Sequence, residues 1–274
     1  MKHKQLMIAI IKIFLTVIIM FVFLLPLFWL ITSSFKTPRD IFSLKFRILF
    51  EPTFNNYYIV IKSAFLYKLF NSAFIGLATV IIVLPFGLFA AYAFSRFRFA
   101  AQHTLFFILL TTTIAPPVAF AVPIFMLFRR LGLLDAHLSL ILCYVLFNIG
   151  FTTWVLRGFI EDVPREIEEA ALVDGCSPWG VLFKITLPLI SNGIVTTGIL
   201  VFIFSWNEFL FASLLTRTKA ATFTTHLVTY FGSRRVLWGE LCAAATIGAL
   251  VPIALALLTR KYIIRGMTFG AIKG

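Results

Sequence analysis

The stretch Glu161–Pro188, EDVPREIEEAALVDGCSPWGVLFKITLP, holds six of the eleven acidic residues of a 274-residue chain. Long apolar runs flank it on both sides. Charged side chains are costly to place in hydrocarbon, so a segment this acidic must lie in water or against another protein. The stretch therefore marks a surface element between membrane-embedded parts of the chain.

The composition of the chain is that of a polytopic membrane protein. Hydrophobic residues make up 61% of it and charged residues 13%, whereas a soluble domain has about 25% charged residues. The net charge of +13 comes from Lys and Arg at the ends of apolar runs and not from one basic stripe, which argues against nucleic-acid binding. The three cysteines lack C-x-x-C spacing, so we predict neither a metal site nor a disulfide framework.

Six apolar stretches are long enough for a spanning helix, which needs about 20 mostly apolar residues. They cover residues 10–31, 71–94, 104–128, 138–156, 191–214 and 241–258. We predict an all-α polytopic fold, with one transmembrane domain over residues 1–274. The first apolar run exceeds the core of a signal peptide, so we expect it to remain as a span.

The distribution of positive charge leaves the orientation open. Cytoplasmic loops usually carry the excess of Lys and Arg. With both termini on the cytoplasmic side, the 24 basic residues divide equally between the two sides of the membrane. The charges before the first span favour cytoplasmic termini only slightly.

Prolines interrupt the predicted third span at Pro116, Pro117 and Pro123. Irregular backbone at membrane depth is tolerated where it lines a cavity or is buried in protein. The sequence therefore allows either a bend beside a translocation path or a simple packing kink.

A polar cluster, Trp206-Asn207-Glu208, falls within the predicted fifth span. An intramembrane carboxylate is a candidate functional site, and the neighbouring amide suits a polyhydroxylated solute. We take these three residues as a candidate substrate path. The alternatives are that Glu208 stabilises a helix end or a subunit contact, and that Trp206 anchors the chain at the membrane interface.

The acidic stretch carries the signals of two short helices joined by a tight turn. Pro164 suits the first turn of a helix, and Gly175 suits a left-handed stop. Ser177 is a suitable N-cap for a second helix that begins at Pro178. We therefore expect a helix, a turn and a second helix.

One face of the first helix is formed by Ile167, Ala170, Ala171 and Asp174, which recur at helical spacing. Small side chains on this face let another backbone approach closely. A helix lying on the bilayer surface usually has Lys and Arg on its polar face, whereas this one carries Glu. The pattern favours a protein partner with a basic rim over lipid.

The same stretch resembles the EAA loop of ATP-binding-cassette (ABC) importer permeases. Glu169-Ala170-Ala171 is followed after three residues by Gly175, and after nine more by Ile185-x-Leu187-Pro188. Further motifs resemble the MalG-like carbohydrate permease subfamily: Pro52-Thr53 with Asn56-Tyr57, Leu131-Gly132-Leu133, Trp206-Asn207-Glu208-Phe209, and the tail Arg265-Gly266-Met267-Thr268-Phe269-Gly270-Ala271-Ile272-Lys273-Gly274. Phe269 stands where the subfamily usually has a small residue.

This resemblance implies the six-helix, MetI-like fold of type I ABC importers. It places the EAA loop and both termini in the cytoplasm of a bacterium whose inner membrane the chain crosses. The implied ATPase-docking residues are Glu168, Glu169, Ala170, Ala171, Asp174, Gly175, Ile185, Leu187 and Pro188. The implied tail contacts to the ATPase are Arg265, Gly266, Thr268, Gly270 and Lys273.

The resemblance also implies partners: a second, MalF-like permease subunit, two ATPase subunits, an extracytoplasmic solute-binding protein, membrane lipid and a sugar substrate. The chain contains no G-x-x-x-x-G-K-[ST] and no H-E-x-x-H motif. We therefore predict a transport subunit without catalytic residues, cofactor or metal of its own, with ATP and Mg²⁺ on the ATPase subunits. Three alternatives stay open: an ABC permease for an amino acid, peptide or ion, an ion-coupled secondary transporter, and a membrane-embedded enzyme.

Overall fold

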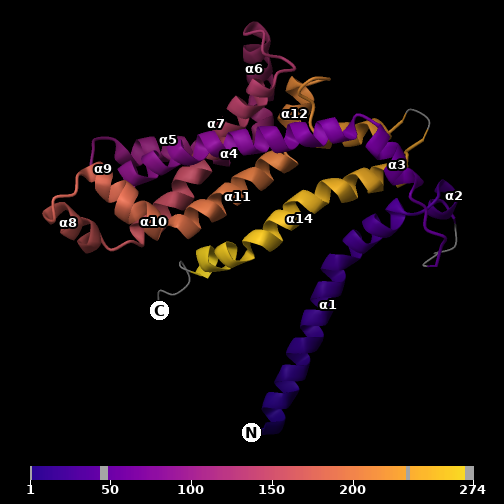
Figure 1. Ribbon diagram of the computed structural model, residues 1–274, viewed down its shortest axis with the longest axis horizontal. Coiled ribbons are helices and arrows are strands. Elements are labelled where there is room, and N and C mark those ends of the chain that lie inside the picture. The colour runs from indigo at the N-terminus through magenta and orange to yellow at the C-terminus, as the bar shows by residue number, and fades with distance from the viewer. Residues whose placement is uncertain (1, 44–48, 233–234, 269–274) are drawn as a thin grey trace. The chain divides into compact units, whose positions relative to one another are not determined.

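The computed structural model describes residues 2–43, 49–232 and 235–268, and the side chains of residues 6–43, 49–232 and 235–260 (Figure 1). The described residues form helices, with one isolated antiparallel bridge between Phe231 and Val236. The predicted all-α class is confirmed. By its contacts the chain divides into two compact units, residues 1–66 with 226–250, and residues 67–225 with 251–274.

The first unit contains a long apolar helix and a short surface structure. Its helices are α1 (Lys2–Ser34), α2 (Pro38–Ile41), α3 (Asn55–Lys62), the 3-10 turn η2 (Val228–Tyr230) and the first half of α14 (Trp238–Thr268). The buried amide of Asn56 donates hydrogen bonds to the carbonyl oxygens of Ser34 and Lys36, at 2.8 and 3.0 Å. These bonds fasten α3 to the end of α1.

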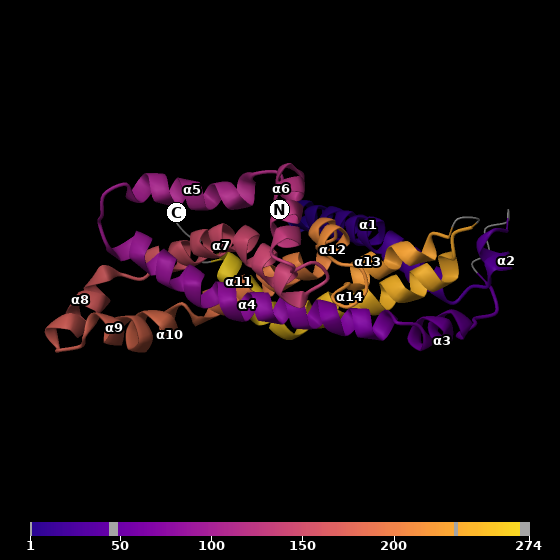
Figure 2. The ribbon, with the colours of Figure 1, turned by 90° about the horizontal axis from the view of Figure 1, so that it is seen from above.

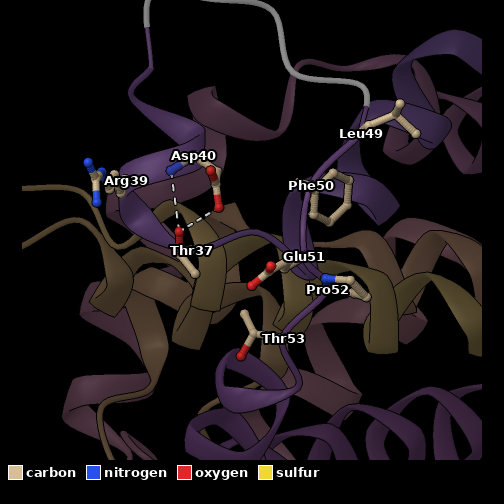
Figure 3. A pocket seen from close by; sticks show the side chains of 8 residues that line it. All are labelled: Thr37, Arg39, Asp40, Leu49, Phe50, Glu51, Pro52 and Thr53. Atoms are coloured by element: carbon tan, nitrogen blue, oxygen red, sulfur yellow. Dashed lines mark hydrogen bonds between the residues drawn. The ribbon is translucent and has the colours of Figure 1, made fainter.

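The connection after α1 is shaped by a capped turn (Figure 3). Thr37 caps α2, since its hydroxyl oxygen accepts the N–H of Asp40 and its hydroxyl donates to the Asp40 carboxylate at 2.7 Å. A shallow hollow beside this turn is lined by Thr37, Arg39, Asp40, Leu49, Phe50, Glu51, Pro52 and Thr53.

The second unit is a helical bundle with the acidic stretch at one end (Figures 1 and 2). Its helices are α4 (Phe65–Arg96), α5 (Gln102–Ile114), α6 (Pro117–Arg130), α7 (His137–Glu161), α8 (Arg165–Val173), α9 (Pro178–Val181), the π-helix η1 (Leu182–Thr186), α10 (Leu187–Leu189), α11 (Ser191–Asn207) and α12 (Leu210–Leu215), with α13 (Phe223–Leu227) at its boundary. Helix α7 packs against α5, α11 and α12. It is therefore the central helix of this unit.

Four helices are long and apolar enough to cross a membrane by themselves: α1, α4, α7 and α14. They correspond to four of the six predicted spans. The other two predicted spans are not continuous helices. If each bent helix pair counts as one span, up to six spans result.

The predicted third span, residues 104–128, is broken by a bend of 92° between α5 and α6. Ala115 and Pro116 both have extended backbone, with ψ of 138° and 123°. Each of them precedes a proline, and the proline ring disfavours helical backbone in the residue before it. Two consecutive prolines therefore turn a predicted kink into a complete break.

The predicted fifth span, residues 191–214, is also broken. Helix α11 ends at Asn207, Glu208 is extended with ψ of 129°, and α12 begins at Leu210. A second bend, of 74°, separates α11 from the helical segment Pro178–Leu189 before it. The predicted start of this span, residue 191, coincides with the second bend, but hydropathy did not detect the break at Glu208.

Helix α4 joins the two ends of the second unit. At 1.5 Å per residue its 32 residues extend about 48 Å, which exceeds a hydrocarbon core of about 30 Å. The acidic stretch lies at the C-terminal end of α4 (Figures 1 and 2). The helix is therefore long and apolar enough to cross a membrane with its two ends on opposite sides.

Candidate functional site

The acidic stretch forms the helix, turn and helix that its sequence predicts, and we call Arg165–Leu189 the coupling segment. Gly175 has φ of +88° and ends α8. Its N–H donates to Leu172 O and the next N–H, of Cys176, to Ala171 O, which is the Schellman arrangement. Ser177 Oγ accepts the N–H of Gly180 at 3.1 Å and caps α9. Pro164 is the N-cap of α8 and not its first helical residue.

A buried ion pair fastens the coupling segment to α4. Glu168 is 6% exposed, and its Oε2 lies 2.6 Å from Arg96 Nε in the last turn of α4. Thr186 in η1 donates its hydroxyl to the other carboxylate oxygen of Glu168 at 2.6 Å. One carboxylate thus holds together the end of α4, helix α8 and the π-helix.

Arg96 also holds the end of α7. Its Nη2 donates to the carbonyl oxygens of Ile160 and Val163 at 2.8 and 2.9 Å. Carbonyl groups at a helix C-terminus lack helical partners and carry partial negative charge, so a guanidinium is a favourable donor there. Arg165 at the start of α8 adds a bond of 2.9 Å to Ser95 O. These bonds connect the coupling segment directly to the ends of α4 and α7.

The predicted docking residues fall into two groups. Glu169, Ala170, Asp174, Gly175 and Pro188 are exposed. Glu168 and Ala171 are buried against the chain itself, and Ile185 and Leu187 are half-buried. The EAA motif thus presents its Glu and first Ala outward and its second Ala inward.

Exposed apolar side chains surround the outward part of the motif. Val173 is 88% exposed and Trp179 65%. A recess of about 220 Å³ lies beside them between α4 and α8, and its lining includes Tyr92, Glu169 and Leu172. Apolar surface next to a recess is typical of a protein interaction site.

Sequence reasoning missed Arg96 and Thr186. Arg96 is one of many basic residues at the end of a span, and it lies 72 positions before Glu168. Helical spacing in α8 could have indicated the inward direction of Glu168. Glu168 is three residues before Ala171, so the two side chains lie on the same side of the helix, and both are buried.

The predicted substrate-path residues have three different environments. Trp206 is 1% exposed and its ring packs between those of Phe202 and Phe223, with centroids at 5.6 and 4.8 Å. Asn207 is exposed. Glu208 accepts the N–H groups of Phe211 and Ala212, at 2.9 and 3.1 Å, so it caps α12.

A cavity of about 190 Å³ lies where the two helix breaks meet. It is lined by Thr113, Pro117, Tyr144, Phe147, Asn148, Phe151, Phe204, Ser205, Glu208 and Phe211. Tyr144 donates its hydroxyl to Glu208 at 2.9 Å. Ser205 Oγ is buried and has no hydrogen-bond partner in the described part of the chain. The cavity therefore combines aromatic walls with a carboxylate, an amide and an unused hydroxyl.

The predicted tail contacts lie at the edge of the described region. Arg265, Gly266 and Thr268 belong to the end of helix α14, and their side chains are outside the described set. Gly270 and Lys273 lie outside the described residues altogether. Within the described residues, no group of three or more His, Cys, Asp or Glu is placed to hold a metal ion.

Comparison with known proteins connects this arrangement to membrane transport. Residues 83–268 match the family described as "Binding-protein-dependent transport system inner membrane component". The trehalose transport system permease protein SugB of Mycobacterium tuberculosis is 35% identical, over 92% of this chain and 93% of its own. The trehalose/maltose transport system permease protein MalG of Thermococcus litoralis is 30% identical, over 92% of each chain.

A solved structure shares the fold. A chain of a bacterial ABC transporter involved in the import of the acidic polysaccharide alginate superposes with a TM-score of 0.78, over 94% of this chain and 97% of that one. Its sequence identity is 22%. The common architecture is therefore preserved at low identity.

Proposed function

The chain belongs to the family of binding-protein-dependent transport system inner membrane components, and we propose that it is a permease subunit of an ATP-driven importer of a carbohydrate. It is a transport subunit and not an enzyme. The sugar assignment is supported by relatives whose names specify trehalose, maltose and diacetylchitobiose transport. The single structural observation that carries the proposal is the coupling segment, whose outer face is free while its inner face is fixed to α4 and α7.

We further propose the assembly in which this chain works. It pairs with a second permease chain, two ATPase subunits that bind ATP and Mg²⁺, and an extracytoplasmic solute-binding protein. The coupling segment and both termini face the cytoplasm of a bacterium, and the tail from Arg265 to Lys273 contacts an ATPase. The largely apolar surface of α1, with no buried residue in its most apolar window, faces lipid or the second permease chain.

The mechanism is alternating access driven from the coupling segment. Closure of the ATPase subunits moves a groove that holds Glu169, Ala170 and Gly175. Because Glu168 is bonded to Arg96, this displacement pulls on the ends of α4 and α7. Coupling between distant sites requires such a contiguous element with two arrangements.

The solute path in this chain runs past the cavity at the two helix breaks. Discontinuous helices at membrane depth are typical of transporter binding sites, because the interrupted backbone is tolerated where it lines a cavity. Asn148 lies near the middle of α7, a candidate membrane span, which supports a position of the cavity within the membrane. Aromatic walls can stack on a sugar ring while Glu208 and Ser205 bond to its hydroxyl groups.

The docking claim is tested by Glu169→Lys combined with Gly175→Asp in the assembled complex. We expect the loss of solute-stimulated ATP hydrolysis and of uptake. Glu166→Lys is the matched control, since Glu166 is an exposed acid on the same helix outside the motif. Normal solute-stimulated hydrolysis in the double variant would contradict the docking role. Uptake that follows a proton or sodium gradient without ATP would instead indicate a secondary transporter.

The cavity is tested separately by the kinetics of uptake. Ser205→Ala and Asn148→Leu remove polar groups from its lining, and Ser213→Ala removes an exposed hydroxyl from α12 as the control. We expect the first two to reduce uptake while stimulation of ATP hydrolysis by the loaded solute-binding protein is retained. Unchanged uptake in both would exclude this cavity from the solute path.

A further inference from the structure

The turn before α7 contains an aspartate in a strained conformation. Asp135 has φ of +58°, a left-handed backbone that is uncommon for residues other than glycine. Such strain persists only where the surrounding structure imposes it, and it is concentrated at functional positions. Asp135 lies outside both the coupling segment and the cavity.

The carboxylate of Asp135 binds four consecutive backbone N–H groups of the loop between α12 and α13. The N–H groups of Arg217, Thr218, Lys219 and Ala220 donate to it at 2.9 to 3.2 Å, and the Thr218 hydroxyl donates at 2.8 Å. A carboxylate has about four lone-pair positions, so its capacity is filled. We call this set of bonds the Asp135 clamp.

The carbonyl groups of the same loop are held by side chains from the start of α4. Asn71 Nδ2 donates to Lys219 O and Ala221 O at 2.8 and 2.9 Å. Lys68 Nζ donates to Thr218 O, and Tyr67 donates its hydroxyl to Lys219 O. Donors and acceptors of the loop backbone are thus both fixed, although loops are usually the mobile part of a fold.

The side chains that this rigid backbone presents are basic. Arg217 and Lys219 are exposed, while Ala220 between the clamp and the bundle is fully buried. Two more exposed basic residues, Arg129 and Arg130, lie in the last turn of α6, just before the turn that contains Asp135.

Basic side chains outnumber acidic ones at this end of the unit. Outside the acidic stretch, the acids of the second unit are Asp135 and Glu208, and both carboxylates accept backbone N–H groups. The clamp lies by the first turns of α4, so it is on the opposite side of the membrane from the coupling segment. With cytoplasmic termini, Arg129, Arg130, Arg217 and Lys219 are among the basic residues on the outer side of the membrane. They help to explain why counting Lys and Arg left the orientation open.

We propose that the Asp135 clamp holds Arg217 and Lys219 as a fixed basic rim on which an acidic surface of the solute-binding protein docks. The inference rests on the proposed import function. A rigid backbone favours a protein over anionic lipid, because attraction to lipid requires only charge and gains nothing from a fixed loop. Complementary charge at such a rim accelerates association and sets its salt dependence.

The test is a titration of the solute-binding protein encoded with this chain, loaded with its sugar, against the assembled complex in zwitterionic nanodiscs. ATP hydrolysis is expressed relative to each variant's own basal rate. For Arg217→Gln combined with Lys219→Gln, we expect the half-maximal concentration to rise between about 2-fold and about 30-fold at low salt. The difference should shrink as salt screens the charges.

Two further variants separate the effect of the basic side chains from the effect of the fixed loop backbone. Asp135→Asn leaves every basic side chain of the rim in place, yet it weakens the clamp, so it should also raise the half-maximal concentration while leaving the maximal rate little changed. Arg98→Gln removes an exposed charge from the other end of the unit and should have no effect.

The proposal is overturned if the double variant keeps the half-maximal concentration and salt dependence of the unchanged complex. It is also overturned if the effect appears only when anionic lipid is added, since the partner would then be the lipid headgroup. If the unchanged complex shows no stimulation at any concentration, the import function itself is contradicted, which is a different result from either of these.

Discussion

Arg96 Nε lies 2.6 Å from Glu168 Oε2, and side chains that are less than one-tenth exposed make this a buried ion pair. Removing one partner of such a pair leaves an uncompensated charge, which costs about 3–5 kcal/mol. We expect Arg96→Met to lower the free energy of unfolding by about this amount, and so to lower the unfolding temperature of the complex. We also expect it to uncouple ATP hydrolysis from uptake. Unfolding temperature and solute moved per ATP measure the two effects.

The control for this variant is Arg157→Gln, which breaks the exposed pair between Arg157 and Glu161 on α7. Pairs of this kind contribute only about 0.3–0.5 kcal/mol. Replacing both buried partners, with Arg96→Met and Glu168→Met together, should recover much of the stability. If Arg96→Met behaves like Arg157→Gln, the buried pair does not hold the coupling segment.

Gly175 and Gly158 form a matched pair for testing the turn of the coupling segment. A Cβ would meet no atom within 4 Å at either position, but only Gly175 has a positive φ. Gly175→Ala should cost about 1–2 kcal/mol because of left-handed strain, whereas Gly158→Ala in the helix should be neutral or stabilising. Thermal unfolding and ATPase pull-down compare them. Equal behaviour would mean that the turn does not require glycine.

Asp135→Asn should release the loop that follows α12. In the unchanged protein we expect the amide hydrogens of residues 217–220 to exchange slowly, because each is bonded to the Asp135 carboxylate. In the variant they should exchange faster, while those of α7 stay protected. Hydrogen exchange read by mass spectrometry measures both segments. Equal protection in both proteins would show that the loop is held without the carboxylate.

The pH dependence of this protection follows from the same bonds. Burial raises the pKa of Asp135, but the N–H groups of Arg217 and Lys219 and their neighbours outweigh it and hold the pKa well below its ordinary value of 3.8. A lowered pKa gives stability that is present above the ordinary value and is lost as the pH falls below it. The protection of the amide hydrogens of residues 217–220, corrected for intrinsic exchange, should therefore stay constant from neutral pH down to about the ordinary pKa of an aspartate.

Gly150 permits the close contact of α5 and α7. A Cβ at this position would lie 2.3 Å from Leu109 O and 2.7 Å from Thr113 Oγ1. Gly150→Ala should force the helices apart and cost about 1–3 kcal/mol, with Gly158→Ala again as the control on the same helix. Thermal unfolding decides between them, and equal stability would show that α5 can move aside.

Local features of the acidic stretch were predictable from sequence. The stop at Gly175 and the cap at Ser177 depend on the backbone preferences of single residues, so neighbouring positions suffice to predict them. The inward direction of Glu168 depends on Arg96, a residue distant in sequence. The resemblance to the EAA loop placed Glu168 with the docking residues because a local motif carries no information about such a distant partner.

The broken spans show a different limit of sequence reasoning. Hydropathy measures how apolar a segment is, and residues 104–128 remain apolar through the bend. The prolines at 116 and 117 were visible, but whether they kink or break a helix depends on what fills the bend. Similarly, the sequence did not show that Glu208 accepts the Phe211 and Ala212 N–H groups and caps α12 while it also lines the cavity.

The π-helix Leu182–Thr186 carries one further consequence. Its wider turn holds one residue more than an α-helical turn, two residues before Pro188, which has no N–H to donate. Because the turn absorbs this residue, deleting one residue from it would restore α-helical winding and leave the segment before it near its present angle. Deleting one residue from the α-helical turn of α9 instead would rotate that segment by about 100° around the axis. The direction of the outward Glu169 is therefore tolerant of a change in length at the π-helix and sensitive to one beside it.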